Sequence, residues 1–132
     1  RLVQSAGDPP SWVITTVDAP VEAERRLVAA GLEVMRVGAD DTGRVRLDEA
    51  MRLLGARGIT RVFCEGGPTL AEGLAQSGLI DEAVLVTGAE KLDQPGLRAV
   101  GPALAHYIGN RMQAFAEEYA GPDRFSYFER SA

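Results

Sequence analysis

The chain has very few of the side chains that build metal and disulfide sites. It contains one cysteine, Cys64, and one histidine, His106. A single cysteine excludes an internal disulfide and is typical of a reducing compartment. Metal sites need clustered ligands, and the sequence shows none, so we expect no bound metal. We expect Cys64 to be a small buried hydrophobic residue rather than a nucleophile, because no motif places a base beside it.

Long apolar runs and blocks of basic residues are also missing. No run approaches membrane-spanning length, and the start of the chain lacks the basic, apolar and small-residue pattern of a signal peptide. The 14 basic residues are scattered against 19 acidic ones, which gives a net charge of −5. A nucleic-acid-binding protein usually carries a basic face. We therefore expect no membrane segment, no nucleic-acid partner and a cytoplasmic location.

Length and composition are those of one globular domain. The 132 residues are 45% apolar and 25% charged, which is enough to bury a core. The chain begins at Arg1, in polar sequence and without a methionine. We expect residues 1–132 to be a single domain that forms the C-terminal part of something longer.

Apolar and β-branched residues predict four strands in the first two thirds of the chain. Helical periodicity fills the stretches between them, with Gly31 and Gly58 as stop signals. Strands that alternate with helices imply crossover connections and a largely parallel sheet. The four expected strands are 12–16, 32–37, 61–65 and 82–87.

The last 21 residues have a different pattern. Residues 112–119 and 124–129 lean toward period two around Gly121-Pro122-Asp123, which predicts a hairpin and an antiparallel edge to the sheet. Residues 92–110 are weakly patterned, and we expect a loop with one short helix there. The apolar hairpin side chains suit either a homodimer interface or core packing, and the sequence leaves both open. They are Phe115, Tyr119, Phe125, Tyr127 and Phe128.

The most informative stretch is 61–74, RVFCEGGPTLAEGL. An apolar run ends in Glu65, turns through two glycines and opens a helix. Backbone N–H groups at such a turn are free to bind an anion such as a nucleotide pyrophosphate. The spacing fits neither the dinucleotide-binding fingerprint nor the P-loop. A tight strand-to-helix connection explains the same pattern equally well.

Three polar residues at the ends of expected strands are further candidates. Glu65 can bond to a substrate hydroxyl or transfer a proton, and it can equally cap the N–H groups of its own turn. Thr15 and Thr16 can bind a ribose or phosphate, or they can simply end a strand and satisfy a turn.

The run from Cys64 to Ala71, followed by Gly-Leu-Ile-Asp-Glu at 78–82, resembles the reductase domain of riboflavin biosynthesis. That domain is the C-terminal half of a bifunctional deaminase–reductase. In the family, a strand ends in E-G-G-P-T-L and a short helix then leads to G-L-V-D-E. The terminal hairpin also matches the usual ending of the family. The resemblance implies a dihydrofolate-reductase-like α/β fold with three α/β/α layers, a mostly parallel sheet and an antiparallel C-terminal hairpin.

The resemblance also implies an activity, namely NADPH-dependent reduction of the ribosyl group of 5-amino-6-(5-phosphoribosylamino)uracil to the ribityl form. Glu65 would contact this phosphorylated aminopyrimidine, and Thr15 and Thr16 would lie near the adenosine end of NADPH. The backbone N–H groups nearest the pyrophosphate would be those of Gly67, Thr69 and Leu70. The whole implied cofactor loop is Gly67, Pro68, Thr69, Leu70, Ala71, Glu72 and Gly73.

The chain departs from the family in places. The first part of the family's domain, which supplies substrate-phosphate contacts and much of the nicotinamide pocket, is absent, so we do not expect these residues to be catalytically complete alone. Ala89 and Asp93 stand where the family usually has proline and glycine. No residue stands out as a general acid. The resemblance allows a deaminase domain in the full-length chain, and the sequence leaves open whether one is fused upstream. The alternatives are another dihydrofolate-reductase-like pteridine or pyrimidine reductase, and a non-catalytic nucleotide-binding or assembly module.

Overall fold

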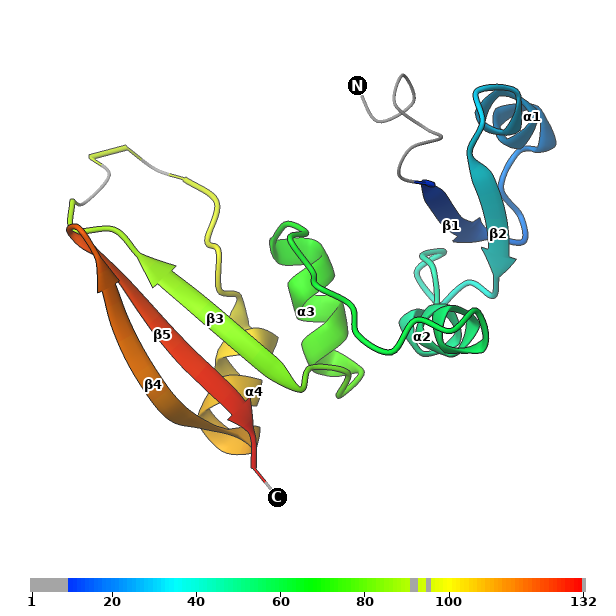
Figure 1. Ribbon diagram of the computed structural model, residues 1–132. Helices are drawn as coiled ribbons and strands as arrows, with labels where there is room; N and C mark the ends of the chain where they lie inside the picture. Colours follow the sequence, from blue (N-terminus) through cyan, green and yellow to red (C-terminus); the bar gives the residue numbers. More distant parts are fainter. Residues whose placement is uncertain (1–9, 91–92, 95, 132) are drawn as a thin grey trace. The chain divides into compact units, whose positions relative to one another are not determined.

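The computed structural model describes residues 10–90, 93–94 and 96–131. The chain divides into two compact units, residues 1–62 and 63–132. Each unit has its own sheet, and Figure 1 shows the strands and helices of both. The α/β class expected from the sequence is confirmed, with parallel strands and an antiparallel C-terminal hairpin. That residues 1–132 act as a single domain stays a prediction.

The first unit is built on two parallel strands, β1 (Trp12–Thr16) and β2 (Glu33–Val37). Parallel neighbours need a crossover connection, and α1 (Val21–Ala29) supplies it. Gly31 follows α1 with φ 88°, a left-handed conformation that suits glycine and ends the helix as expected. After β2 comes α2 (Leu47–Ala56). The buried side chains of this unit are Leu32, Met35, Val37 and Ala50.

The second unit contains an antiparallel sheet with the strand order β3–β5–β4. Its strands are β3 (Glu82–Thr87), β4 (Met112–Ala120) and β5 (Asp123–Arg130). Two helices accompany the sheet, α3 (Pro68–Gln76) and α4 (Pro102–Arg111). Figure 1 shows α4 along one face of the sheet, and it is longer than the short helix expected there. The buried core of this unit is Ala75, Leu104, Tyr107 and Met112.

The prediction of a strand at Arg61–Glu65 is wrong. No described strand pairs with this segment, so it lacks the ladder that would satisfy its backbone N–H and C=O groups as a strand. In the described part of the chain, parallel pairing joins β1 to β2 only, whereas β3, β4 and β5 pair antiparallel. Val62 and Phe63 are 49% and 81% exposed. Cys64, expected to be buried in that strand, is exposed for the same reason.

Candidate functional site

The glycine turn, which we define as residues 65–69, leads directly into α3. Gly67 is the N-cap residue, with φ −71° and ψ 179°, and Pro68 occupies the first helical turn, where its missing N–H costs nothing. The N–H groups of Leu70 and Ala71 both donate to the Gly67 carbonyl, at 3.1 and 3.2 Å. The Leu70 N–H, expected to face a pyrophosphate, is thus already engaged.

The start of α3 nevertheless keeps unpaired donors. No side chain caps this helix, and in the described part of the chain the N–H groups of Gly67 and Thr69 have no hydrogen-bond acceptor. The positive end of the helix dipole lies at the same place. A helix start of this kind has the donors and the field to hold an anionic oxygen.

The two glycines of the turn have different surroundings. A Cβ atom on Gly66 would lie 2.6 Å from Cδ2 of Leu70, so Gly66 leaves room for the Leu70 side chain of α3. A Cβ atom on Gly67 would meet no described atom within 4 Å. Neither packing nor its ordinary backbone angles require glycine at position 67. Glycine is a favoured N-cap residue, and close approach of a ligand to the backbone is a second reason for glycine at this position.

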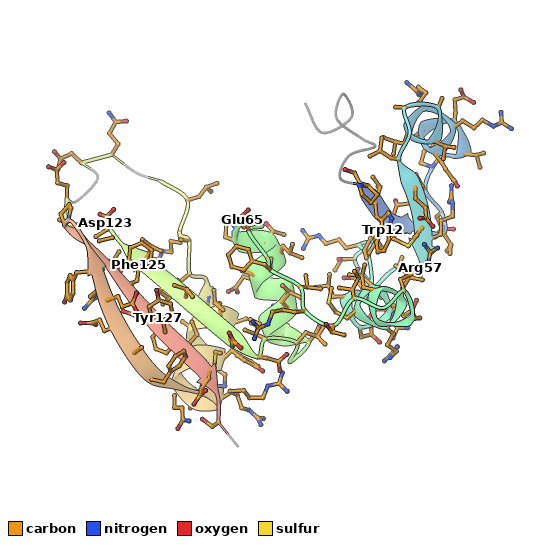
Figure 2. All side chains as sticks on the ribbon, viewed as in Figure 1. Trp12, Arg57, Glu65, Asp123, Phe125 and Tyr127 are labelled. Carbon is orange, nitrogen blue, oxygen red and sulfur yellow. The ribbon has the colours of Figure 1, made fainter. Side chains whose placement is uncertain are left out.

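Glu65 lies immediately before these donors, and Figure 2 shows it beside the start of α3. Its side chain is exposed, and its carboxylate accepts no hydrogen bond from any residue that the structure describes. The alternative in which Glu65 caps its own turn is therefore not what the structure shows. The carboxylate is free to accept a hydrogen bond from a bound molecule.

The remaining residues of the implied cofactor loop have several environments. Thr69 and Leu70 are exposed, whereas Ala71 packs against the core of the second unit and Gly73 is half-buried within α3. Both carboxylate oxygens of Glu72 are occupied, because they accept the N–H groups of Ala103 and Leu104. Nothing in the sequence pattern signals this contact across 31 residues.

Thr15 and Thr16 belong to the first unit, apart from the glycine turn in the chain, and they end β1 half-buried. The Thr16 carbonyl accepts the Ala19 N–H at 3.1 Å and the Arg36 Nη1 at 3.3 Å. The Thr16 carbonyl therefore accepts a hydrogen bond within the turn that follows β1, which agrees with the interpretation that these threonines end a strand and belong to a turn. A ligand contact by either side chain stays a prediction.

The loop after β2 is more ordered than its polar sequence suggests. Asp40 Oδ1 accepts the Thr42 hydroxyl at 2.7 Å and the backbone N–H groups of Thr42 and Arg44 at 2.8 and 2.9 Å. These hydrogen bonds, with that of the Thr42 side chain the largest cause, hold the pKa of Asp40 below its ordinary value. Because the folded pKa is lowered, this contribution to stability is complete above the unfolded pKa and is lost as pH falls through the folded pKa.

Replacing Thr42 by valine is expected to raise the pKa of Asp40 toward its ordinary value, since the hydroxyl donor disappears while the volume is kept. A carboxyl NMR titration measures this pKa directly. Thr60→Val, an exposed threonine outside the loop, is the control and should leave Asp40 unchanged. An Asp40 midpoint that does not move in Thr42→Val would show that the two backbone donors suffice.

Residues 10–90, 93–94 and 96–131 contain no group of three or more His, Cys, Asp or Glu side chains that could hold a metal ion. Among the helices described, none is long and apolar enough to cross a bilayer.

Comparison with known proteins extends these observations. The family model of the RibD C-terminal domain matches residues 2–89. The riboflavin biosynthesis protein RibD of Bacillus amyloliquefaciens is 30% identical over 80 residues, which are 61% of this chain and 21% of the relative. The chain thus spans about a fifth of that curated relative.

Two solved structures have a similar fold. A pyrimidine reductase-like protein from Corynebacterium diphtheriae matches with a TM-score of 0.68 and 19% identity, over 93% of this chain and 50% of its own. RibD of Acinetobacter baumannii matches with a TM-score of 0.67 and 17% identity, over 92% of this chain and 38% of its own. At these identities the likeness establishes the fold alone.

Proposed function

The chain belongs to the RibD C-terminal domain family, and on that premise we propose that it serves the reductase step of riboflavin biosynthesis. The substrate we propose is 5-amino-6-(5-phosphoribosylamino)uracil, whose ribosyl group is reduced to the ribityl form. The cofactor we propose is NADPH, which when bound supplies the hydride for C1 of the opened sugar.

One observation carries the proposal, namely that an uncapped helix start and a free carboxylate lie next to each other in the chain. The unpaired N–H groups of Gly67 and Thr69 fit the oxygens of a pyrophosphate, and the open space at Gly67 lets the anion reach the backbone. The role of these residues is to bind and orient the cofactor. Proton transfer has no assigned residue in this chain.

Glu65 has a separate role in the proposal. Its unpartnered, exposed carboxylate can accept hydrogen bonds from the hydroxyl or N–H groups of the aminopyrimidine. A carboxylate also favours positive charge as it develops on the sugar carbon and nitrogen, because opposite charges attract strongly when water is excluded. Glu65 thus orients the substrate and stabilises its reactive form.

A thermal melt of the protein with and without NADPH tests the cofactor assignment. A ligand that binds only the folded state stabilises it by mass action and so raises Tm. At a ligand concentration of a hundred times its Kd, the free energy of unfolding rises by about 2.7 kcal/mol. We expect a larger rise with NADPH than with NADH at equal concentration. A cooperative melt that neither dinucleotide moves would argue against a dinucleotide site and favour the non-catalytic alternative.

A further inference from the structure

The carboxylate of Glu72 reaches from α3 to the start of α4. Its Oε2 accepts the Ala103 N–H at 2.9 Å and its Oε1 accepts the Leu104 N–H at 2.8 Å. These donors lie in the first turn of α4, whose N-cap residue Gly101 has no side chain to satisfy them. Both hydrogen bonds are charge-assisted and lie at the positive end of the α4 dipole. One side chain of α3 therefore caps a second helix.

Gly101 provides the space for this contact. A Cβ atom at this position would lie 2.4 Å from Cδ and 2.6 Å from Oε1 of Glu72. The backbone at Gly101 has φ −86° and ψ 179°, which any residue adopts, so glycine is not needed for conformation. We call the set formed by Glu72, Gly101 and the N–H groups of Ala103 and Leu104 the Glu72–Gly101 clamp.

The clamp holds the middle of α3, about one helical turn after the glycine turn. Glu72 lies four residues after Pro68, the first residue of α3. Farther along α3, Ala75 packs in the core with Leu104 and Tyr107 of α4. Apolar packing alone allows a helix to slide or rotate slightly, whereas two directed hydrogen bonds fix its register. The directions of the Gly67 and Thr69 N–H groups follow from that register.

We propose that Glu72 is a positioning residue, which aims the N–H groups of the glycine turn at the cofactor pyrophosphate through the Glu72–Gly101 clamp and does not itself touch the cofactor. The identity of the ligand in this statement rests on the proposed function, whereas the ordering of the turn does not. A plain helix cap and a positioning clamp make different predictions once α4 is capped in another way.

The double variant Glu72→Ala/Gly101→Ser in the full-length protein separates the two roles. Glu72→Ala alone removes both acceptors and should lower Tm by about 5 °C. In the double variant the atoms that crowd position 101 are gone, and a serine hydroxyl can cap α4 from its own N-cap position. Tm should then recover, although no polar contact joins α3 to α4 any longer.

Hydrogen exchange without ligand is the decisive readout. The Leu70 and Ala71 amides, which bond to the Gly67 carbonyl, should exchange about tenfold faster in the double variant than in the wild type. The Kd for NADPH should be weaker by about tenfold, because small misplacements of binding groups are costly. If the double variant recovered its Tm and both amides exchanged at the wild-type rate, the proposal would be overturned and Glu72 would only cap α4.

Tyr107→Phe is the matched control on α4. It removes the hydroxyl that donates to the Ile80 carbonyl at 3.0 Å and leaves the clamp intact. This variant should lower Tm without changing hydrogen exchange at the Leu70 and Ala71 amides. If these amides exchanged as fast as in the double variant, any loosening of α4 would reach the glycine turn, and the proposal would be overturned. A wild-type protein that binds no NADPH would refute the proposed cofactor only, since exchange is measured without it.

Discussion

Replacing Gly67 by valine is expected to weaken NADPH binding by about a hundredfold or more while the protein stays folded. A side chain at position 67 would add bulk to a residue whose own N–H has no acceptor among the described residues, and beyond its chain neighbours a Cβ there would meet nothing within 4 Å. A pyrophosphate could then no longer approach those donors, and the loss of two hydrogen bonds to a charged group, at about 1.5 kcal/mol each, corresponds to about a hundredfold in affinity. The backbone angles at Gly67 are ordinary, so the loss in folding stability should be about 0.5 kcal/mol.

Calorimetric titration with NADPH measures the affinity, and a melt without ligand checks the fold. Gly96→Val is a suitable control, because Gly96 belongs to the same unit and a Cβ atom there also meets nothing within 4 Å. It adds the same side chain far from the turn in sequence and should leave the affinity unchanged. If Gly67→Val bound NADPH as tightly as the wild type, the glycine turn would not be the pyrophosphate site.

Replacing Glu65 by glutamine is expected to lower kcat/KM for the aminopyrimidine substrate by about 10- to 100-fold. The substitution keeps the shape of the side chain but removes its charge, and a hydrogen bond to a charged group contributes about 1.5–3 kcal/mol. Affinity for NADPH should change little, because the N–H donors of Gly67 and Thr69 remain in place.

Steady-state assays of the full-length protein, following NADPH consumption with 5-amino-6-(5-phosphoribosylamino)uracil, measure both kinetic constants. Glu90→Gln is the control, since Glu90 is an exposed glutamate of the same unit. A Glu65→Gln enzyme with wild-type kcat/KM would remove Glu65 from the substrate site. A loss of NADPH affinity equal to the loss of activity would instead place Glu65 at the cofactor.

Local patterns in the sequence were sufficient for most helices and strands. Period two identified the C-terminal hairpin, the β-branched run identified β1, and the two glycines marked the start of α3. Each of these signals depends on residues close together in the chain, such as a turn residue beside an apolar run. The α/β class followed from their order.

The errors came from interactions that local patterns do not contain. The segment Arg61–Glu65 has the composition of a strand, but a strand also needs a neighbouring strand to pair with, and no described strand pairs with this segment. Burial of Cys64 was inferred from that strand and was wrong with it. The contact between Glu72 and the start of α4 was missed because the two lie 31 and 32 residues apart.

The second unit contains two helices that begin with the same dipeptide, Gly67-Pro68 in α3 and Gly101-Pro102 in α4. Each start offers backbone donors and a positive dipole end, so a dinucleotide would meet two similar docking points. A resident carboxylate, that of Glu72, already fills one of them. Of these two helix starts, the glycine turn is therefore the one whose N–H donors lack an acceptor among the described residues, so the same dipeptide begins a structural contact in α4 and the pyrophosphate site that we propose in α3.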